Sequence, residues 1–447
     1  MYTLEEVAQH KFRHSCWVVI KNHAYDVTQF LDEHLGGAGA ILQHAGKDAT
    51  AVYEALHPPG IIEQLPQVHN EVQHRSPNAE WTPNLDTLQN LEDFEHVAKL
   101  VLSPRSWAYY SSGAEDLRSF KNNRNDWAKI TLRPRVLRNV ARVSLRSRIM
   151  GHESSLPVFI SPTALARLGH PDGELCLARG AARHNVVYAV STYSSTSHEQ
   201  VAACCEAESA LHPNLRFGGG AVAFQLYLPL NKVQGGRERI AKAKALGYQE
   251  LVVTVDTAVI GKREADEGLK AELGASTLNS IGAKVQCPGE PGNDTPDDFQ
   301  WIKAAWGSGP IIIKGIQTVE DALRASEAGV QGIYLSNHGG RQLDHAPSST
   351  QTLLEINYFC PDILKKVEVY LDGGVRRGTD VIKAVCLGAT GSGYGTDGVV
   401  KALQPLSDEI ETALRLMGVV DISELDPTFL NTTALDRDLV STQYDSL

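Results

Sequence analysis

The stretch Gly332-Ile333-Tyr334-Leu335-Ser336-Asn337-His338-Gly339-Gly340-Arg341-Gln342 joins a short apolar run to a polar, glycine-containing heptad. The run 332–335 predicts a buried strand, so the heptad 336–342 would lie at its carboxyl end. His338 can accept a proton near neutral pH, and Arg341 can hold a carboxylate through paired charged hydrogen bonds. Together these two side chains suit a 2-hydroxy acid as ligand. Taken alone, the heptad could also be a turn with an exposed arginine.

Six other apolar runs have the same form, each ending at a small or polar residue. They are 158–160, 186–190, 223–224, 251–253, 311–313 and 367–371. A barrel of parallel strands delivers chemistry at the carboxyl end of many strands, whereas an open doubly wound sheet gathers ligand groups at one switch point. The seven runs, with helical segments between them, therefore predict an α/β fold, a (β/α)8 TIM barrel.

The eighth strand of this barrel has no obvious counterpart. Thr390-Gly391-Ser392-Gly393 is short and rich in glycine, which weakens a strand. We interpret 391–395 as a flexible connection, and not as a dinucleotide-binding loop, because a helical stretch precedes it. A barrel without its eighth strand would leave backbone groups unpaired at an open edge. We therefore expect the eighth strand to be deleted and the barrel wall to be open.

Composition limits the partners and the location of this 447-residue chain. A net charge of −11 argues against nucleic acid, and no apolar run approaches the ~18 residues of a membrane span. Seven scattered cysteines without a Cys-x-x-Cys pair indicate reduced thiols. Because no signal or transit peptide is recognisable, we expect a cytoplasmic protein, or one of the mitochondrial intermembrane space if the N-terminus is incomplete.

The residue pattern of the sequence changes along the chain. Residues 1–75 mix short strand-like and helical pieces, prolines are frequent between 58 and 90, and strands alternate with helices from about 91 onward. We predict a small α+β domain over 1–75, a linker over 76–90 and the barrel over 91–447.

Two histidines of the first domain, His34 and His57, each lie beside turn-forming residues. They could bind a haem iron from both sides, although exposed loop histidines would give the same pattern. The surrounding motifs are Cys16-Trp17-Val18-Val19-Ile20, the run from Tyr25 to His34, and His44-Ala45-Gly46-Lys47-Asp48-Ala49-Thr50. Over almost all of 1–60 these motifs resemble cytochrome b5, with Leu35 in place of the usual proline. The resemblance implies that His34 and His57 are the axial ligands of a b-type haem (heme b).

The barrel region carries a second series of motifs. They are Trp107–Ala114, Leu132–Arg135, Ser161–Ala164, Gln225–Tyr227, Thr254–Thr257, Gly261–Asp266, the heptad 336–342 and the run 372–378. This series resembles the FMN-dependent 2-hydroxy-acid oxidase and dehydrogenase family. A haem domain ahead of such a barrel resembles the flavocytochrome b2 group of that family, whose members are L-lactate dehydrogenases of the cytochrome type.

The resemblance implies a role for each matching residue. The implied catalytic set is the base His338 with its partner Asp256, Arg341 and Tyr109 at the substrate carboxylate, Tyr227 at the substrate hydroxyl, and Arg263. The implied FMN site consists of Pro162, Thr163, Ala164, Ser191, Gln225, Thr254, Lys314, Asp372, Gly373, Gly374 and Arg376. Each residue also has a purely structural alternative. Gln225 and Thr254 could merely form hydrogen bonds with backbone groups at strand ends, and Arg376 could be a solvated arginine at the start of a helix.

The chain departs from this family after the seventh strand. The family's Gly-Arg-Pro phosphate loop is absent, since Leu387-Gly388-Ala389-Thr390-Gly391-Ser392-Gly393 runs straight into Tyr394-Gly395-Thr396-Asp397-Gly398-Val399. The arginine that would pair with the flavin phosphate is lost with that loop. We therefore expect FMN to bind weakly, although the catalytic set is intact.

The resemblance implies that FMN oxidises an L-2-hydroxy acid such as L-lactate to the 2-oxo acid. Electrons would then pass through the haem to cytochrome c or a similar acceptor, and the protein would form a homo-oligomer, a tetramer by analogy. Tyr193, at a position facing the substrate side chain, leaves a larger or specialised hydroxy acid open. A haem electron carrier whose barrel has lost flavin is a further alternative, which a visible spectrum without flavin absorption would reveal.

Overall fold

The computed structural model describes residues 4–21, 23–34, 37–50, 52–53, 67–69, 87–211, 221–229, 231–272, 296–394 and 399–439. The chain divides into two compact units, one built mainly from Met1–Asn84 and the other from the residues that follow. The predicted boundaries at 75 and 90 stay predictions. None of the described helices is both long and apolar enough to cross a bilayer.

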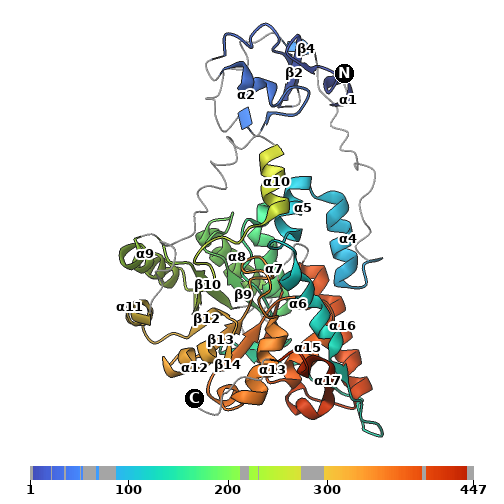
Figure 1. The fold of residues 1–447 in the computed structure, drawn as a ribbon, viewed down its shortest axis with the longest axis vertical. Helices are drawn as coiled ribbons and strands as arrows, with labels where there is room; N and C mark the ends of the chain where they lie inside the picture. Colours follow the sequence, from blue (N-terminus) through green and yellow to red (C-terminus); the bar gives the residue numbers. More distant parts are fainter. Residues whose placement is uncertain are drawn as a thin grey trace. The chain divides into compact units, whose positions relative to one another are not determined.

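The first unit is a small antiparallel sheet with short helices beside it (Figure 1). Its strands, in spatial order, are β1 (Lys11–Phe12), β2 (Ser15–Ile20), β3 (His23–Asp26) and β4 (Gln67–His69), and its helices include α1 (Leu4–Val7) and α2 (Ala38–Leu42). Alternate residues of β2 point to opposite faces: Cys16 and Val18 join one apolar cluster, whereas Trp17 and Val19 join another. The sheet is therefore covered by apolar side chains on both faces.

The second unit is a barrel of parallel strands, as predicted, and its ring of strands is closed (Figure 1). The strands are β8 (Val158–Ile160), β9 (Val187–Val190), β10 (Val222–Leu226), β11 (Glu250–Thr254), β12 (Ile311–Ile316), β13 (Gly332–Leu335), β14 (Glu368–Leu371) and β15 (Gly391–Tyr394). Most are buried along their whole length, because helices cover their outer face and side chains fill the interior. All seven apolar runs recognised in the sequence form strands of this barrel.

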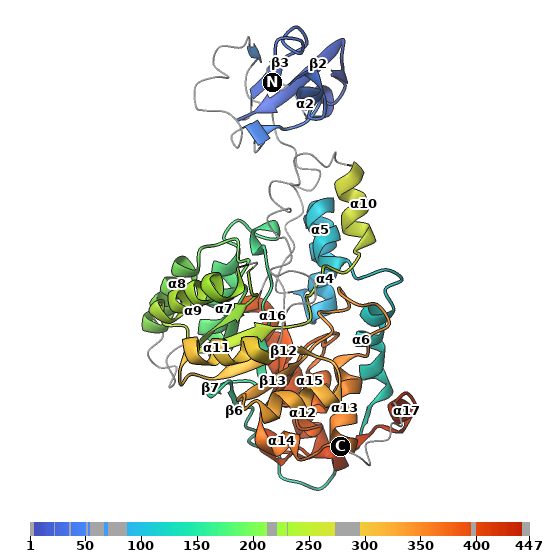
Figure 2. The same ribbon diagram turned by 60° about the vertical axis from the view of Figure 1, so that its left-hand side comes forward.

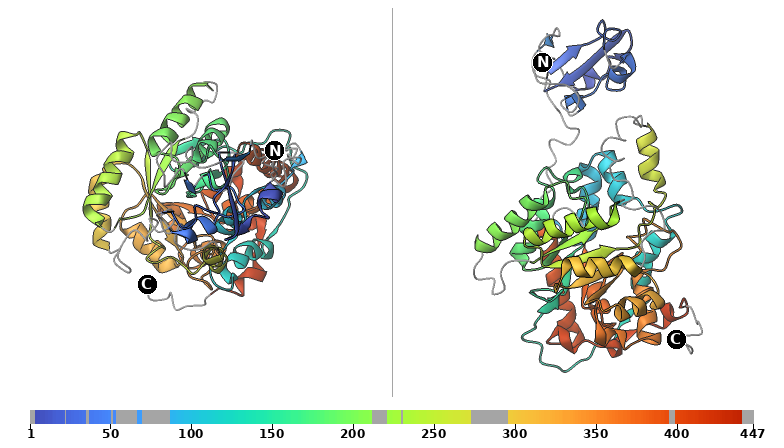
Figure 3. Two further views of the ribbon diagram at one scale, coloured as in Figure 1. Left: turned by 90° about the horizontal axis from the view of Figure 1, so that it is seen from above. Right: turned by 90° about the vertical axis from the view of Figure 1, so that its left-hand side faces the viewer.

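Helices surround the ring of strands, and α8, α9 and α11 lie together along one side of it (Figures 2 and 3). The helices that alternate with the strands are α7 (Glu174–His184), α8 (His198–Leu211), α9 (Lys232–Ala245), α11 (Pro296–Trp306), α12 (Val319–Glu327), α13 (Ser349–Phe359), α15 (Gly378–Cys386) and α16 (Val399–Met417). Three helices precede the barrel, namely α4 (Leu91–Val101), α5 (Pro104–Ser111) and α6 (Arg118–Lys129). The hairpin of β6 (Ser147–Ile149) and β7 (His152–Ser154) places Ile149 and Met150 in the apolar cluster inside the barrel.

The expectation of a deleted eighth strand and an open wall is wrong. Residues Gly391–Tyr394 form β15, which pairs with β14 on one side and with β8 on the other. The interpretation of 391–395 as a flexible connection is therefore also wrong for 391–394, the described part of that stretch. Residues 395–398 lie outside the described part of the chain.

Close packing explains why this strand is rich in glycine. A Cβ atom on Gly393 would lie 2.2 Å from the hydroxyl oxygen of Ser161 and 2.6 Å from that of Tyr334. A Cβ atom on Gly391 would lie 2.5 Å from a methyl carbon of Ile149. Because large side chains already fill the barrel at this level, glycine is what allows the last strand to close it.

Candidate active site

The heptad after β13 is held in an unusual backbone conformation. His338, Gly339 and Gly340 have φ angles of 59°, 67° and 74°, so three consecutive residues are left-handed. Gly340 has to be glycine, because a Cβ atom there would lie 2.4 Å from the backbone nitrogen of Phe120. A left-handed histidine is strained by about 1–3 kcal/mol, and such strain persists only where the surroundings hold it in place.

The surroundings of the heptad are a set of side-chain hydrogen bonds. The amides of Asn337 and Asn123 exchange hydrogen bonds of 2.8 Å in both directions. The Asn337 amide oxygen also accepts from the backbone N–H of Gly340 at 2.9 Å, and the hydroxyl of Ser336 accepts from the N–H of His338 at 3.0 Å. The strained turn is therefore fixed from both sides before any ligand binds.

His338 faces a buried carboxylate with one ring nitrogen and a phenol with the other. Its Nδ1 lies 2.9 Å from Oδ1 of Asp256, and its Nε2 lies 3.3 Å from the hydroxyl of Tyr227. Burial alone would raise the pKa of Asp256, but the charges of His338 and Lys314 lower it, so this carboxyl stays ionised. The arrangement orients the imidazole and would stabilise its protonated form.

Two guanidinium groups lie beside the ring of Tyr109. Arg341 is 5.1 Å and Arg263 is 5.8 Å from the ring centroid. One nitrogen of Arg341 donates to the backbone carbonyls of Tyr109, Tyr110 and Ser112, at 2.7, 3.3 and 3.2 Å. Burial and the like charge of Arg263 lower the pKa of Arg341 to about 10, which still leaves the group charged at neutral pH. This corner of the site is suited to an anion.

Lys314, at the end of β12, is a buried cation between two carboxylates. Its Nζ lies 3.9 Å from Oδ2 of Asp256 and 3.9 Å from Oδ2 of Asp372, and it donates to the hydroxyl of Ser336 at 3.0 Å. Asp372 in turn accepts from Ser336 at 2.7 Å and from the Tyr334 hydroxyl at 2.9 Å. These contacts hold the Lys314 side chain between Asp256 and Asp372, at the carboxyl ends of the strands.

One cavity of about 420 Å³ collects most of the predicted residues. Its lining includes Tyr109, Tyr227, Arg263, His338, Arg341, Pro162, Thr163, Ala164, Ser191, Lys314, Asp372, Gly373, Gly374 and Arg376. Asp256 is not part of the lining and acts on it through His338. The volume is that of a site for a small ligand or cofactor.

Gln225 and Thr254 are the two predicted flavin contacts that the cavity lining does not include. The Gln225 amide donates to the Thr254 hydroxyl at 3.0 Å and accepts from the backbone N–H of Thr192 at 3.1 Å. In this structure both side chains brace neighbouring strand ends, which is the alternative considered from the sequence. Their role toward flavin stays a prediction.

Helix α4 contributes cavity residues that the sequence did not indicate. Phe94 and Glu95 line the cavity, and Glu95 forms an ion pair of 2.7 Å with Arg376. Tyr110 also lines the cavity and donates to the carbonyl of Leu165 at 2.8 Å. No local sequence pattern identifies Glu95 as a site residue, because its partner Arg376 is far away in the sequence and comes close only in the folded chain.

The residues present fit a flavin in this cavity. The lining combines aromatic and aliphatic surface with the fixed charge of Lys314, and Arg376 supplies a second cation at the side formed by α4. A flat ring with an anionic reduced form and a phosphate tail requires both features.

In the first unit, the structure describes one of the two predicted haem ligands. His34 Nδ1 lies 3.2 Å from the carbonyl oxygen of Gly37, and its ring meets Phe30 edge-on. When Nδ1–H donates to a carbonyl, Nε2 keeps the lone pair that a metal needs, so His34 fits a haem ligand. His57 lies outside the described residues, and the pairing of the two histidines stays a prediction.

Comparisons with known proteins agree with this geometry. Residues 98–432 match the model of the FMN-dependent dehydrogenase family, and residues 3–90 match that of the cytochrome b5-like heme/steroid binding domain. The chain belongs to the FMN-dependent dehydrogenase family. It is thus an FMN-dependent dehydrogenase with a cytochrome b5-like domain, and FMN and haem are its cofactors.

Individual relatives match this dehydrogenase over most of its length. The L-lactate dehydrogenase (cytochrome) of Wickerhamomyces anomalus is 36% identical over 100% of this chain and 82% of its own length. The protein of the same name from Saccharomyces cerevisiae is 34% identical over 99% and 81%. The recombinant flavin-binding domain of baker's yeast flavocytochrome b2 has a TM-score of 0.70 at 36% identity, covering 80% of this chain and 90% of its own.

Proposed function

We propose that this dehydrogenase oxidises a small L-2-hydroxy acid, L-lactate or a close analogue, to the 2-oxo acid. The observation that carries the proposal is the juxtaposition, in one cavity, of the His338–Asp256 pair with the two arginines beside Tyr109. The pair supplies a base, and the arginines supply a site for the substrate carboxylate. Two relatives covered over about four-fifths of their length carry the name L-lactate dehydrogenase (cytochrome).

The residues of the site have separate roles in this reaction. Arg341 and Arg263 bind the carboxylate and so orient the substrate in the cavity. Tyr227 binds the C2 hydroxyl, and His338 accepts the proton that the substrate loses, while Asp256 stabilises the resulting imidazolium. When bound, FMN would supply the acceptor for the two electrons and for the second of the two hydrogens that the hydroxy acid loses. Lys314 then supplies positive charge where the reduced cofactor gains negative charge.

The haem domain supports a further step, in which electrons pass singly from the flavin through the b-type haem to cytochrome c or a similar soluble acceptor. The bond from His34 to the Gly37 carbonyl is consistent with an iron ligand on that domain. A homotetramer and a cytoplasmic location complete the proposal. Reduction of cytochrome c, size-exclusion chromatography with light scattering, and cell fractionation would test these three points.

Tyr193 favours a small substrate side chain. Its ring lies 5.5 Å from that of Tyr227 in a stacked arrangement, and both line the cavity. A phenol at this place occupies space next to the group that binds the substrate hydroxyl. Relative kcat/KM values for lactate, longer aliphatic hydroxy acids and mandelate would test this, and a preference for mandelate would contradict it.

The decisive experiment measures flavin reduction by substrate in a His338→Gln variant under anaerobic conditions. We expect FMN to stay bound and its reduction by L-lactate to slow by at least about 100-fold, because a general base contributes 10²–10⁴. Tyr248→Phe serves as the control, since Tyr248 does not line the cavity and its hydroxyl donates to the carbonyl of His198 at 3.2 Å. Near-normal flavin reduction in the His338 variant would show that another group is the base.

A further inference from the structure

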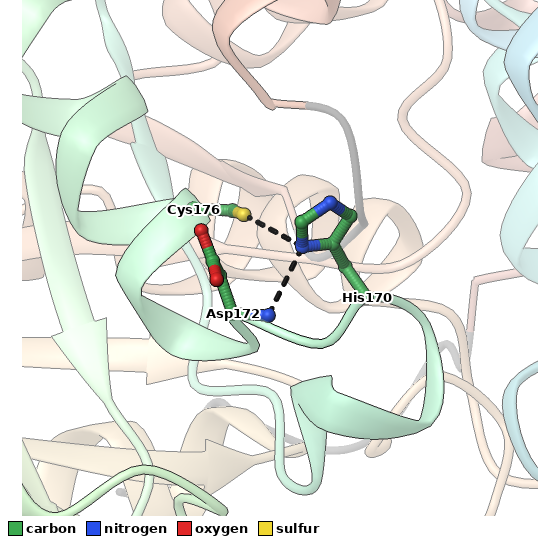
Figure 4. Close-up of side chains that lie close together, drawn as sticks. All are labelled: His170, Asp172 and Cys176. Atoms are coloured by element: carbon green, nitrogen blue, oxygen red, sulfur yellow. Dashed lines mark hydrogen bonds between the residues drawn. The ribbon is translucent and has the colours of Figure 1, made fainter.

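Three side chains with metal-binding atoms meet on the connection between β8 and α7. The ligand atoms of His170, Asp172 and Cys176 lie within 4.8 Å of one another, and none of the three residues lines the catalytic cavity (Figure 4). They can be reached from solvent, since His170 and Asp172 are exposed and Cys176 is partly exposed. Within the described ranges this is the one such group of three. Thiolate, imidazole and carboxylate are the donors that Zn²⁺ takes from proteins.

The backbone of the turn brings these three side chains together. The N–H of Gly173 donates to the carbonyl of His170 at 2.8 Å, and the N–H of Cys176 donates to the carbonyl of Gly173 at 3.0 Å, which places Cys176 in the first turn of α7. Gly173 has a φ of 52°, and a Cβ atom there would lie 2.7 Å from Cγ of Arg167. The glycine therefore fixes a tight turn, so the cluster is held by backbone geometry.

The hydrogen bonds of the cluster show which nitrogen of His170 faces the other two ligands. Nδ1 accepts from the backbone N–H of Asp172 at 3.1 Å and lies 3.3 Å from Sγ of Cys176 (Figure 4). Because a backbone N–H can only donate, Nδ1 is the unprotonated nitrogen, and a metal ion at its lone pair would replace this hydrogen bond. Since Cys176 binds metal as the thiolate, metal binding would release the thiol proton.

The third ligand is oriented by a neighbouring cation. Arg179, one turn further along α7, lies 2.7 Å from Oδ2 of Asp172. A ligating carboxylate is commonly hydrogen-bonded by such an outer group, which leaves its second oxygen for the metal.

We propose that His170, Asp172 and Cys176 bind one divalent ion of the zinc class, with water as the fourth ligand. This site is distinct from those of FMN and haem. It lies on the loop that carries Thr163 and Ala164 into the catalytic cavity. The neighbouring Glu174 is buried and accepts from the backbone N–H groups of Ala166 at 2.9 Å and Ser195 at 2.8 Å. A bound ion would further stabilise this loop, which Glu174 already connects to the segment after β9 through its hydrogen bond with Ser195.

The test uses the full-length, tag-free holoprotein after removal of metals with a chelator. Zn²⁺ titration against a chromophoric chelator should show one site per chain in addition to any other zinc bound. X-ray absorption at the zinc edge, to which the haem iron does not contribute, should show a sulfur ligand at about 2.3 Å. Thermal unfolding should shift upward with Zn²⁺ because the ion binds the folded state.

A matched pair of variants makes the test specific. Cys176→Ser should abolish the sulfur signal and weaken this zinc site by at least about 10-fold, whereas Cys360→Ser, a partly exposed cysteine elsewhere, should change neither. Circular dichroism of the metal-free variants confirms that both are folded. Equal zinc affinity in the Cys176 variant and the unaltered chain, or zinc bound without sulfur, would overturn the proposal.

Discussion

The ion pair between Glu95 and Arg376 predicts that a glutamate of α4 opposes FMN binding. Arg376 is the one arginine among the predicted FMN contacts, and so the cation that remains for the flavin phosphate; Glu95 forms an ion pair with it at 2.7 Å. Replacing Glu95 by Gln should therefore tighten FMN. The side chains of Arg376 and Glu95 are 29% and 42% exposed, so we assign the pair only ~0.2–1 kcal/mol.

Removing the carboxylate also removes its repulsion of the phosphate, about 1 kcal/mol at short range in a water-like medium. The sum is about 1–2 kcal/mol, or roughly a 5- to 30-fold lower Kd for FMN in Glu95→Gln. The converse variant, Arg376→Gln, loses a charge-assisted contact of about 1.5–3 kcal/mol and should raise the Kd by roughly 10- to 150-fold.

Quenching of flavin fluorescence on titration of the apoprotein measures both effects. Riboflavin is the matched ligand, because it lacks the phosphate and should bind the unaltered chain and the Glu95 variant alike. Glu92→Gln is the matched protein control: Glu92 lies on the same helix, pairs with Arg124 at 2.8 Å and does not line the cavity. An unchanged FMN affinity in Glu95→Gln, or an equal gain for riboflavin, would refute the reasoning. Stoichiometric flavin after extensive dialysis would refute the expectation that FMN is held weakly.

Three further predictions test other parts of the molecule. Arg341→Lys keeps a cation but cannot make the paired contact, so kcat/KM for L-lactate should fall by roughly 10- to 150-fold, or about 1.5–3 kcal/mol; a fall below threefold in steady-state assays would contradict this. His34→Ala should abolish the low-spin haem spectrum while substrate still reduces the flavin, and an unchanged Soret band would exclude His34 as a ligand. Burial raises the pKa of Glu250 despite its hydrogen bond with His152. The folded protein therefore prefers the protonated acid and loses stability as pH rises from about 4.3, the unfolded value, through the raised pKa. Glu250→Gln should remove this loss and raise the unfolding temperature at neutral pH, whereas an equal dependence on pH in both proteins would count against it.

The strand ends could be predicted from the sequence because a parallel barrel has only one carboxyl face. An apolar run followed by Lys314, by the heptad of His338 or by Asp372 must place those side chains on the same face, whatever the helices between them do. The catalytic cavity confirms that reasoning for most of the predicted residues. The finer question of which side chain meets the ligand and which one braces a neighbour depends on rotamers, as the bond between Gln225 and Thr254 shows.

The eighth strand could not be predicted because close packing, and not β-strand propensity, determines its residue types. The other strands are rich in apolar and β-branched residues, whereas β15 is Gly-Ser-Gly-Tyr. Its glycines are needed because Ser161, Tyr334 and Ile149 leave no room for larger residues. The Glu95–Arg376 contact was invisible for a similar reason, since it joins a helix before the barrel to a loop near its end. Both features depend on contacts between segments far apart in the chain, which local patterns do not report.

The charges around the base suggest why proton transfer to His338 is favoured. Lys314 lies 3.9 Å from each of two carboxylates, Asp256 and Asp372, so with a neutral imidazole these groups carry one negative charge in excess. Uptake of a proton by His338 balances that charge, and the new imidazolium forms 2.9 Å from Asp256. The charge of the substrate carboxylate is balanced separately by Arg341 and Arg263. Because the compensating groups are fixed by the strand ends before substrate binds, little reorganisation is needed when the proton moves.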